Sequence, residues 1–147
     1  MNAPHNRQER RRAASLSTAA GLAPAAAPAD GTRGLLDTAG QLRDRGDLAR
    51  ALQLCQRAVQ LEPGNPEIHF TAATVLEAGR DLANAVDAYR HVLKLRPGFL
   101  PALVNCAACL ADLGELPDSV ELYQRALKAD AGSAVVRHNL AQAFMGL

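Results

Sequence analysis

Apolar residues recur along this chain at a fixed interval of 34 residues. One register holds a large apolar residue each time, at Leu42, Leu76, Leu110 and Phe144. Between these positions the apolar residues follow helical spacing, because side chains three and four residues apart share one face of a helix. Repeats of this length, each one supersecondary unit, stack on their neighbours to bury a continuous core.

Each repeat is predicted to contain two helices joined by a short turn. In the first repeat the turn is at Gly46 and Asp47, where the Asp47 carboxylate is placed to cap the second helix. Pro63 and Gly64 end that helix, because Pro cannot continue the hydrogen-bond ladder and Gly tolerates left-handed dihedral angles. The later helices are predicted at residues 66–80, 81–96, 100–114, 115–130 and 134–146.

Small residues occupy the positions where the two helices of one repeat face each other. They are Ala39, Ala73, Ala107 and Ala141 on the first helices, and Ala51, Ala85 and Ser119 on the second helices. Small side chains let two antiparallel helices approach closely, so we expect a tight contact within each hairpin. The larger Leu, Tyr and Val side chains then fill the layers between successive hairpins.

The pattern Leu-x-x-x-Ala-x-x-Leu, a turn Gly, Ala-x-x-x-Tyr-x-x-Ala and Pro resembles the tetratricopeptide-repeat family over residues 32–147. Some details depart from it: His69 stands at a large first-helix position, the turn glycine of the second repeat is displaced to Gly79, and Ala131 replaces Pro. The resemblance implies an all-α fold, a right-handed superhelical solenoid of antiparallel helix pairs. The implied repeats are 32–65, 66–99, 100–133 and a half repeat, 134–147.

Residues 1–31 differ from the repeats in composition. They are basic at first, with Arg10, Arg11 and Arg12, and then rich in Ala and Pro. Too few large apolar side chains are present to offset the entropy of ordering, so we predict a flexible tail with a transient helix near residues 7–16. Ser, Gly and Pro interrupt its apolar run, which makes a poor secretion signal. The odd number of cysteines, 3, also suits a reducing compartment, so we expect a cytoplasmic protein.

Charge and hydropathy argue against two classes of partner. The formal net charge is only +1, and the repeats carry no concentrated basic surface. No apolar run is long enough for a transmembrane helix. We therefore expect neither nucleic acid nor a membrane as a partner.

Candidate catalytic and metal-binding residues are sparse. Cys106 and Cys109 form a C-x-x-C, but no second pair exists and Cys55 lies in a different repeat, so we interpret all three as packed thiols. The four histidines are dispersed, no Ser or Cys has an evident base beside it, and no Gly-rich phosphate loop is present. We expect no enzymatic activity, no cofactor and no metal.

The resemblance places the first helices on the concave face of the solenoid. It implies a partner-binding wall made of Asp37, Arg43, Phe70, Thr71, Thr74, Val104, Asn105, His138, Asn139 and Gln142. Asn105 and Asn139 lie one repeat apart, and an Asn amide suits an extended peptide backbone because it donates and accepts at once. The row is similar to that of the O-linked N-acetylglucosamine transferase family; the alternative is two solvated polar residues. We expect an interaction scaffold that binds a peptide or protein in its groove.

The last predicted helix has no second helix to cover it. Leu140, Ala141 and Phe144 lie in core register there and form an apolar face. This face is expected to be covered in one of three ways. The chain forms a homodimer through Leu140 and Phe144, it binds a partner there, or it is the N-terminal substrate-recruiting module of a larger, truncated transferase. We favour the last, and the basic start also resembles that of some bacterial multi-domain proteins in which a transferase follows the repeats.

Overall fold

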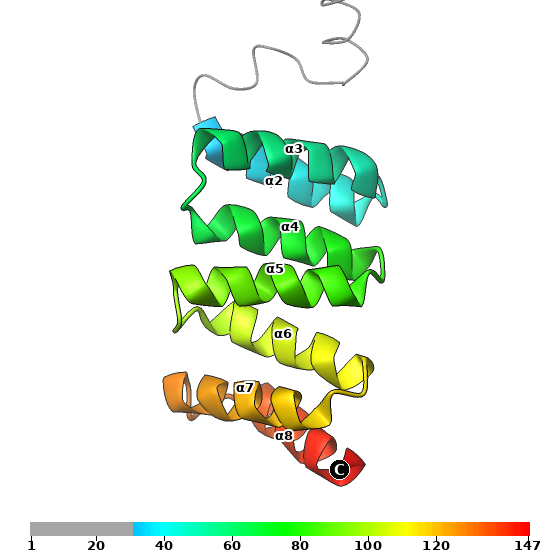
Figure 1. The fold of residues 1–147 in the computed structure, drawn as a ribbon, viewed down its shortest axis with the longest axis vertical. Helices are drawn as coiled ribbons and strands as arrows, with labels where there is room; N and C mark the ends of the chain where they lie inside the picture. The colour runs from blue at the N-terminus through cyan, green and yellow to red at the C-terminus, as the bar shows by residue number, and fades with distance from the viewer. Residues whose placement is uncertain (1–30) are drawn as a thin grey trace, which may run out of the picture.

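The computed structural model describes residues 31–147, which form an all-α helical repeat solenoid. Its helices in this range are α2 (Gly31–Asp44), α3 (Leu48–Leu61), α4 (Pro66–Ala78), α5 (Leu82–Leu95), α6 (Leu100–Asp112), α7 (Leu116–Ala129) and α8 (Ala134–Gly146). They stack in order from α2 and α3 at one end to α7 and α8 at the other (Figure 1). The predicted fold class is confirmed, whereas the tail and its transient helix lie outside the described residues.

An acidic residue precedes the second helix of each complete repeat. These residues are Asp47 before α3, Asp81 before α5 and Glu115 before α7. The Asp47 carboxylate accepts a backbone N–H of the first turn at 3.4 Å, so the predicted cap is confirmed. Asp81 and Glu115 make no such side-chain bond. The prediction that helices begin at these two residues is wrong, because both hold the cap position outside the helix.

The turn inside each repeat contains one residue with left-handed backbone dihedrals. Gly46 has a φ of 82° and Gly114 a φ of 85°. In the second repeat the same register holds Arg80, with a φ of 60°. Gly79 does not take over the role of the turn glycine, as the sequence suggested, because its φ is −79°. A side chain therefore occupies a conformation that glycine adopts far more readily.

The small residues predicted to line each hairpin are completely buried. Exposure is 0% at Ala39, Ala51, Ala73, Ala85, Ala107 and Ser119. The buried Ser119 hydroxyl donates to the carbonyl oxygen of Ala107 at 2.7 Å, so α6 and α7 are in direct contact there. The predicted close approach is confirmed in the three described hairpins. Ala141 is exposed, because no helix follows α8 in the described range.

Larger apolar side chains fill the layers between the hairpins. One cluster joins α2, α3 and α4, with Ile68 completely buried in it. A second cluster runs from α4 to α8 and contains the buried ring of Tyr89. Helix α4 belongs to both, because Val75 packs into the first cluster and Ala73 into the second. The core is therefore continuous along the stack.

The first helices of the repeats lie on a common side of the stack. Helix α2 packs beside α4, and α6 packs beside α8. The second helices α3, α5 and α7 make no comparable contacts with one another. Because neighbouring elements come closest together on the inside of a curved stack, α2, α4, α6 and α8 form its inner side. This is the side on which a binding wall was predicted.

Candidate functional site

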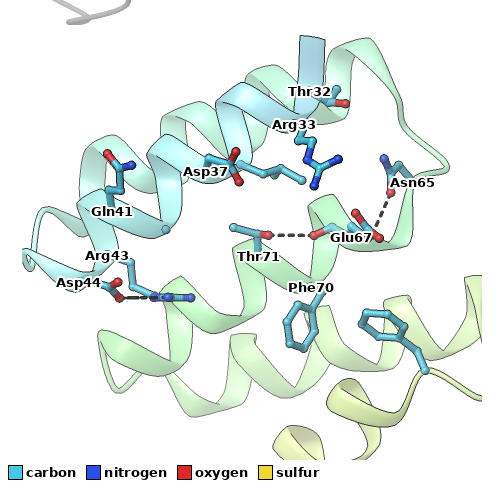
Figure 2. A pocket seen from close by; sticks show the side chains of 13 residues that line it. Thr32, Arg33, Asp37, Gln41, Arg43, Asp44, Asn65, Glu67, Phe70 and Thr71 are labelled. Carbon is cyan, nitrogen blue, oxygen red and sulfur yellow. Dashed lines mark hydrogen bonds and ion pairs between the residues drawn. The ribbon is translucent and has the colours of Figure 1, made fainter. Parts of the chain in front are cut away.

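A groove of about 690 Å³ opens on the inner side of the N-terminal half of the stack. Helices α2 and α4 form its walls, and the start of α6 contributes one edge. Four residues predicted for the binding wall line it together, namely Asp37, Arg43, Phe70 and Thr71 (Figure 2). The groove is open to solvent along its length, which suits an extended ligand rather than an enclosed small molecule.

Part of the groove lining was missed in the sequence. Arg33, Glu67 and Phe99 also line it. Arg33 and Glu67 share one repeat register and lie one helical turn before Asp37 and Thr71, respectively. This spacing is a signal that was available in the sequence. Phe99 gave no such signal, because it lies in a loop and reaches the groove through the contact of its ring with Phe70 on α4.

The other predicted wall residues lie outside this groove, on the same side of the stack. They are the half-buried Thr74 on α4, Val104 and Asn105 on α6 and Asn139 on α8, and the exposed His138 and Gln142 on α8. The structure thus gathers the N-terminal part of the predicted wall into one groove. It distributes the C-terminal part along the inner face beyond it.

The groove carries charges of both signs. The Arg43 guanidinium is held in place, because Nη2 lies 3.0 Å from Asp44 Oδ1 and Nη1 donates to Thr74 Oγ1 at 2.8 Å. Asp37 and Glu67 are exposed and form no ion pair with any residue of the described range. Two carboxylates and the exposed guanidinium of Arg33, which forms no ion pair within residues 31–147, are therefore available to a ligand, whereas Arg43 is held by Asp44 and Thr74.

Aromatic rings form the apolar part of the groove. Phe70 and Phe99 meet edge to face, with ring centroids 5.2 Å apart. Behind them Phe70 contacts the buried Tyr89 ring at 5.8 Å, and the Arg96 guanidinium lies 5.3 Å from the Phe99 centroid. Such pairs hold aromatic side chains in fixed orientations. The groove therefore combines a firm apolar surface with available charges.

A hydrogen-bonded chain next to this aromatic cluster connects Glu77 on α4, Tyr89 on α5 and Asn105 on α6. The Tyr89 hydroxyl donates to Glu77 Oε2, and Asn105 Nδ2 donates to the same hydroxyl oxygen at 3.3 Å. Burial, and then the bond to Glu77, raise the pKa of Tyr89 far above its usual range, while the bond from Asn105 opposes this increase. The hydroxyl therefore keeps its proton, and the direction of the chain is fixed.

The three cysteines are buried thiols. Burial raises the pKa of Cys55 and Cys106 to about 11 and that of Cys109 to about 12. A thiol that stays protonated at neutral pH is a poor nucleophile and a poor metal ligand. The interpretation of Cys106 and Cys109 as packed side chains is confirmed.

Two histidines that are distant in sequence lie together. The rings of His69 on α4 and His91 on α5 meet edge to face with centroids 4.4 Å apart. The sequence interpretation that the histidines are dispersed is therefore wrong for this pair. No group of three or more His, Cys, Asp or Glu residues within 31–147 is arranged to hold a metal ion. In the same range, no helix has the length and apolar character needed to cross a bilayer.

Comparison with known families decides the identity of the fold. A family model described as tetratricopeptide repeat matches residues 42–83 and 76–143. The chain belongs to the tetratricopeptide-repeat family. Tetratricopeptide repeats typically serve as protein-interaction modules. No curated protein sequence matches this tetratricopeptide-repeat chain significantly.

Solved structures, among them two tetratricopeptide-repeat domains, share the architecture at low sequence identity. The first such domain of Spaghetti (RPAP3), bound to the HSP90 peptide SRMEEVD, has a TM-score of 0.75 and 15% identity, covering 82% of this chain and 95% of that one. The Sgt2 domain from Aspergillus fumigatus has a TM-score of 0.74 and 17% identity, covering 84% and 83%. The Yersinia enterocolitica type III secretion chaperone SycD, in complex with a YopD peptide, has a TM-score of 0.72 and 16% identity, covering 80% and 95%. At these identities the similarity concerns the fold.

Proposed function

We propose that this chain is a protein-interaction scaffold that holds an extended segment of a partner protein in its inner groove. The groove between α2, α4 and the start of α6 carries the proposal. It is open along its length, has an aromatic surface at Phe70 and Phe99, and offers carboxylates at Asp37 and Glu67. An extended peptide uses these features together, because its side chains alternate between apolar and polar surroundings.

The structural neighbours support this function by analogy. Two of them were solved with peptides, the RPAP3 domain with an HSP90 peptide and SycD with a YopD peptide. The groove of this chain has its own chemistry, however. Of its two arginines, Arg43 is held by Asp44 and Thr74, so the two carboxylates of Asp37 and Glu67 outnumber Arg33, the one arginine of the groove without an ion pair in the described range. We therefore expect its ligand to differ from an acidic peptide such as SRMEEVD.

Selection from a peptide library tests the proposal. Random-sequence peptides of about nine residues extend to roughly 30 Å, long enough to follow the groove from α2 to α6. We expect selected peptides to bind the full chain and to lose about tenfold in affinity against the Asp37→Arg variant. Reversing an exposed groove charge removes an attraction and adds a repulsion without disturbing the core.

A charge reversal on the outer side provides the matched control. Glu121 is exposed on α7 and lies away from the groove. Glu121→Arg changes the net charge by the same amount as Asp37→Arg and should leave peptide affinity unchanged. Equal losses for both variants would show that only net charge matters, and the groove proposal would then be wrong.

Self-association is the second candidate function, supported by the surface of α8. Phe144 is 50% exposed, Met145 81% and Val135 65%, so large apolar side chains face solvent on this helix. Leu140 is half-buried against the core and contributes less than the sequence suggested. A second copy of α8 would cover the Phe144 side of the helix.

Several expectations from the sequence stay predictions. They concern a transferase that follows the repeats, a cytoplasmic location, and the absence of catalysis and of nucleic-acid binding. Asn139, His138 and Gln142 also remain predicted members of the binding wall. They lie on the inner side of α8, where a ligand longer than the groove would pass.

A further inference from the structure

The hydrogen bonds between α4, α5 and α6 have a fixed direction. The Glu77 carboxylate can only accept, so the Tyr89 hydroxyl donates its single proton to it. The Tyr89 oxygen is then left as an acceptor, and the amide of Asn105 must offer its nitrogen, at 3.3 Å. Tyr89 is 0% exposed, so water does not compete for its hydroxyl. The amide of Asn105 is therefore oriented by a charge on another helix.

This orientation leaves the carbonyl oxygen of Asn105 free. No residue in 31–147 donates a hydrogen bond to its Oδ1, and the side chain is only half-buried. Asn105 lies in the same repeat register as Asp37 and Thr71, which both line the groove. Asn105 thus lies on the inner side, beyond the groove and in the same register as two of its lining residues.

The complete chain of three residues occurs once in the described repeats. One repeat later the registers hold Ala111, Tyr123 and Asn139, so the carboxylate is missing. Asn139 interacts with the Tyr123 hydroxyl, which opposes the increase in the pKa of Tyr123 caused by burial. Without a carboxylate, the Tyr123 proton has no fixed acceptor. This pair provides a natural control for the role of Glu77.

We infer that Glu77 and Tyr89 are positioning residues that turn the Asn105 carbonyl oxygen toward the bound segment, where it accepts a main-chain N–H. The inference rests on the proposed groove function and adds a chemical requirement for the partner. The partner must be extended and must offer an unsubstituted main-chain N–H opposite Asn105. Recognition of this kind depends on backbone rather than on side-chain identity, so it tolerates many sequences.

Ligand-free NMR of the full chain tests the positioning by itself. In the wild type, the side-chain amide of Asn105 should give two well-separated proton signals, one of them protected from exchange by the bond to Tyr89. Tyr89→Phe should remove that protection, and Tyr123→Phe should leave it unchanged. Unchanged Asn105 signals in Tyr89→Phe would overturn the inference even if a peptide binds.

A double-mutant cycle then tests the consequence for binding, with the tightest library peptide as the probe. Asn105→Ala and Tyr89→Phe should each weaken binding about three- to tenfold, the loss of one hydrogen bond. The double variant should bind no more weakly than Asn105→Ala alone, because Tyr89 acts only through that amide. Additive losses would mean that Tyr89 acts on binding through the fold, and the inference would be wrong.

Glu77→Gln keeps the shape of the side chain. It provides a second test of the positioning in case Tyr89→Phe loses affinity through a folding defect. Its amide can donate to the Tyr89 oxygen, which lets the tyrosine proton turn to Asn105 and the Asn105 amide flip. We expect a loss of affinity with unchanged thermal stability. Full affinity in Glu77→Gln would contradict the inference.

Methylation of the peptide identifies the atom that is recognised. Methylating each backbone nitrogen of the probe in turn should weaken binding to the wild type at one position more than at its neighbours. At that position the methyl group should have no effect on binding to Asn105→Ala. If Asn105→Ala itself binds as tightly as the wild type, the inference fails while the groove proposal, tested by Asp37→Arg, stands separately.

Discussion

Single residues decide how the turns of this solenoid are made. The left-handed turn position is a glycine at Gly46 and Gly114 but an arginine at Arg80, with a φ of 60°. A side chain in this region brings its Cβ too close to the backbone, which costs about 1 kcal/mol. The Arg80 guanidinium adds little stability, because its ion pair with Asp112 spans 3.4 Å between two side chains that are 70% and 54% exposed.

Replacing this arginine by glycine should stabilise the protein. We expect Arg80→Gly to raise the free energy of unfolding by about 1 kcal/mol, since the backbone strain disappears and only a weak surface ion pair is lost. Chemical denaturation measures the difference. Arg80→Ala is the matched control, because it loses the ion pair and keeps the strain, so its stability should stay within about 0.5 kcal/mol of the wild type. Equal stabilities of the Gly and Ala variants would show that the turn is unstrained.

Helices pack in pairs here because small residues meet at the centre of each hairpin. Ala73 on α4 and Ala85 on α5 are both 0% exposed, and Ser119 repeats this contact on α7 with a buried hydroxyl bond. The close approach leaves no volume for a larger side chain. The contact therefore determines the distance between the helices of a pair, while the larger apolar residues determine how pairs stack.

Enlarging one of these residues tests the packing of a hairpin. Ala73→Leu should lower the free energy of unfolding by about 1–3 kcal/mol, because the new side chain must displace α5 or adopt a strained rotamer. Ala83→Leu, at an exposed position of α5, should change stability by less than about 0.5 kcal/mol. Thermal or chemical denaturation distinguishes the two. A tolerated Ala73→Leu would mean that the hairpin is less tightly packed than its burial indicates.

The whole molecule is a stack whose two ends differ in character. At the C-terminal end, Phe144, Met145 and Leu147 expose 50%, 81% and 66% of their surface. Exposed large apolar side chains close together favour association, since burial of their surface removes it from water. The inner groove lies in the other half of the stack, because α2 and α4 form its walls. Association through α8 would therefore leave the groove accessible.

Light scattering over a concentration series tests association at this scale. We expect the average mass of the full chain to rise with concentration, as copies pair through α8. Phe144→Glu should keep the monomer mass throughout, because a charge at the centre of the contact cannot be buried without a partner. Leu61→Glu, at an exposed apolar position on α3, should behave as the wild type does. A mass independent of concentration in the wild type would exclude self-association in that range.

The sequence by itself determined the repeat length, the pairing of helices within each repeat and the contacts between small residues inside each pair. These features are periodic, and a side chain such as Ala73 is as completely buried as its equivalents Ala39 and Ala107 one repeat away. Periodicity therefore indicated burial without any knowledge of distances between helices. The inner side on which Asp37 and Thr71 lie was indicated by the resemblance to the tetratricopeptide-repeat family, and the extent of the groove did not follow from the sequence.

Only the tertiary structure decided which side chains of different helices meet. Phe99 closes the groove beside Phe70, His69 lies against His91, and the carboxylate of Glu77 reaches Asn105 through a tyrosine on a third helix. Such contacts depend on the rise and rotation from one helix pair to the next. The large apolar side chains between the pairs jointly determine both. Helical periodicity gives the face of each residue, and the stacking of the pairs gives its neighbours.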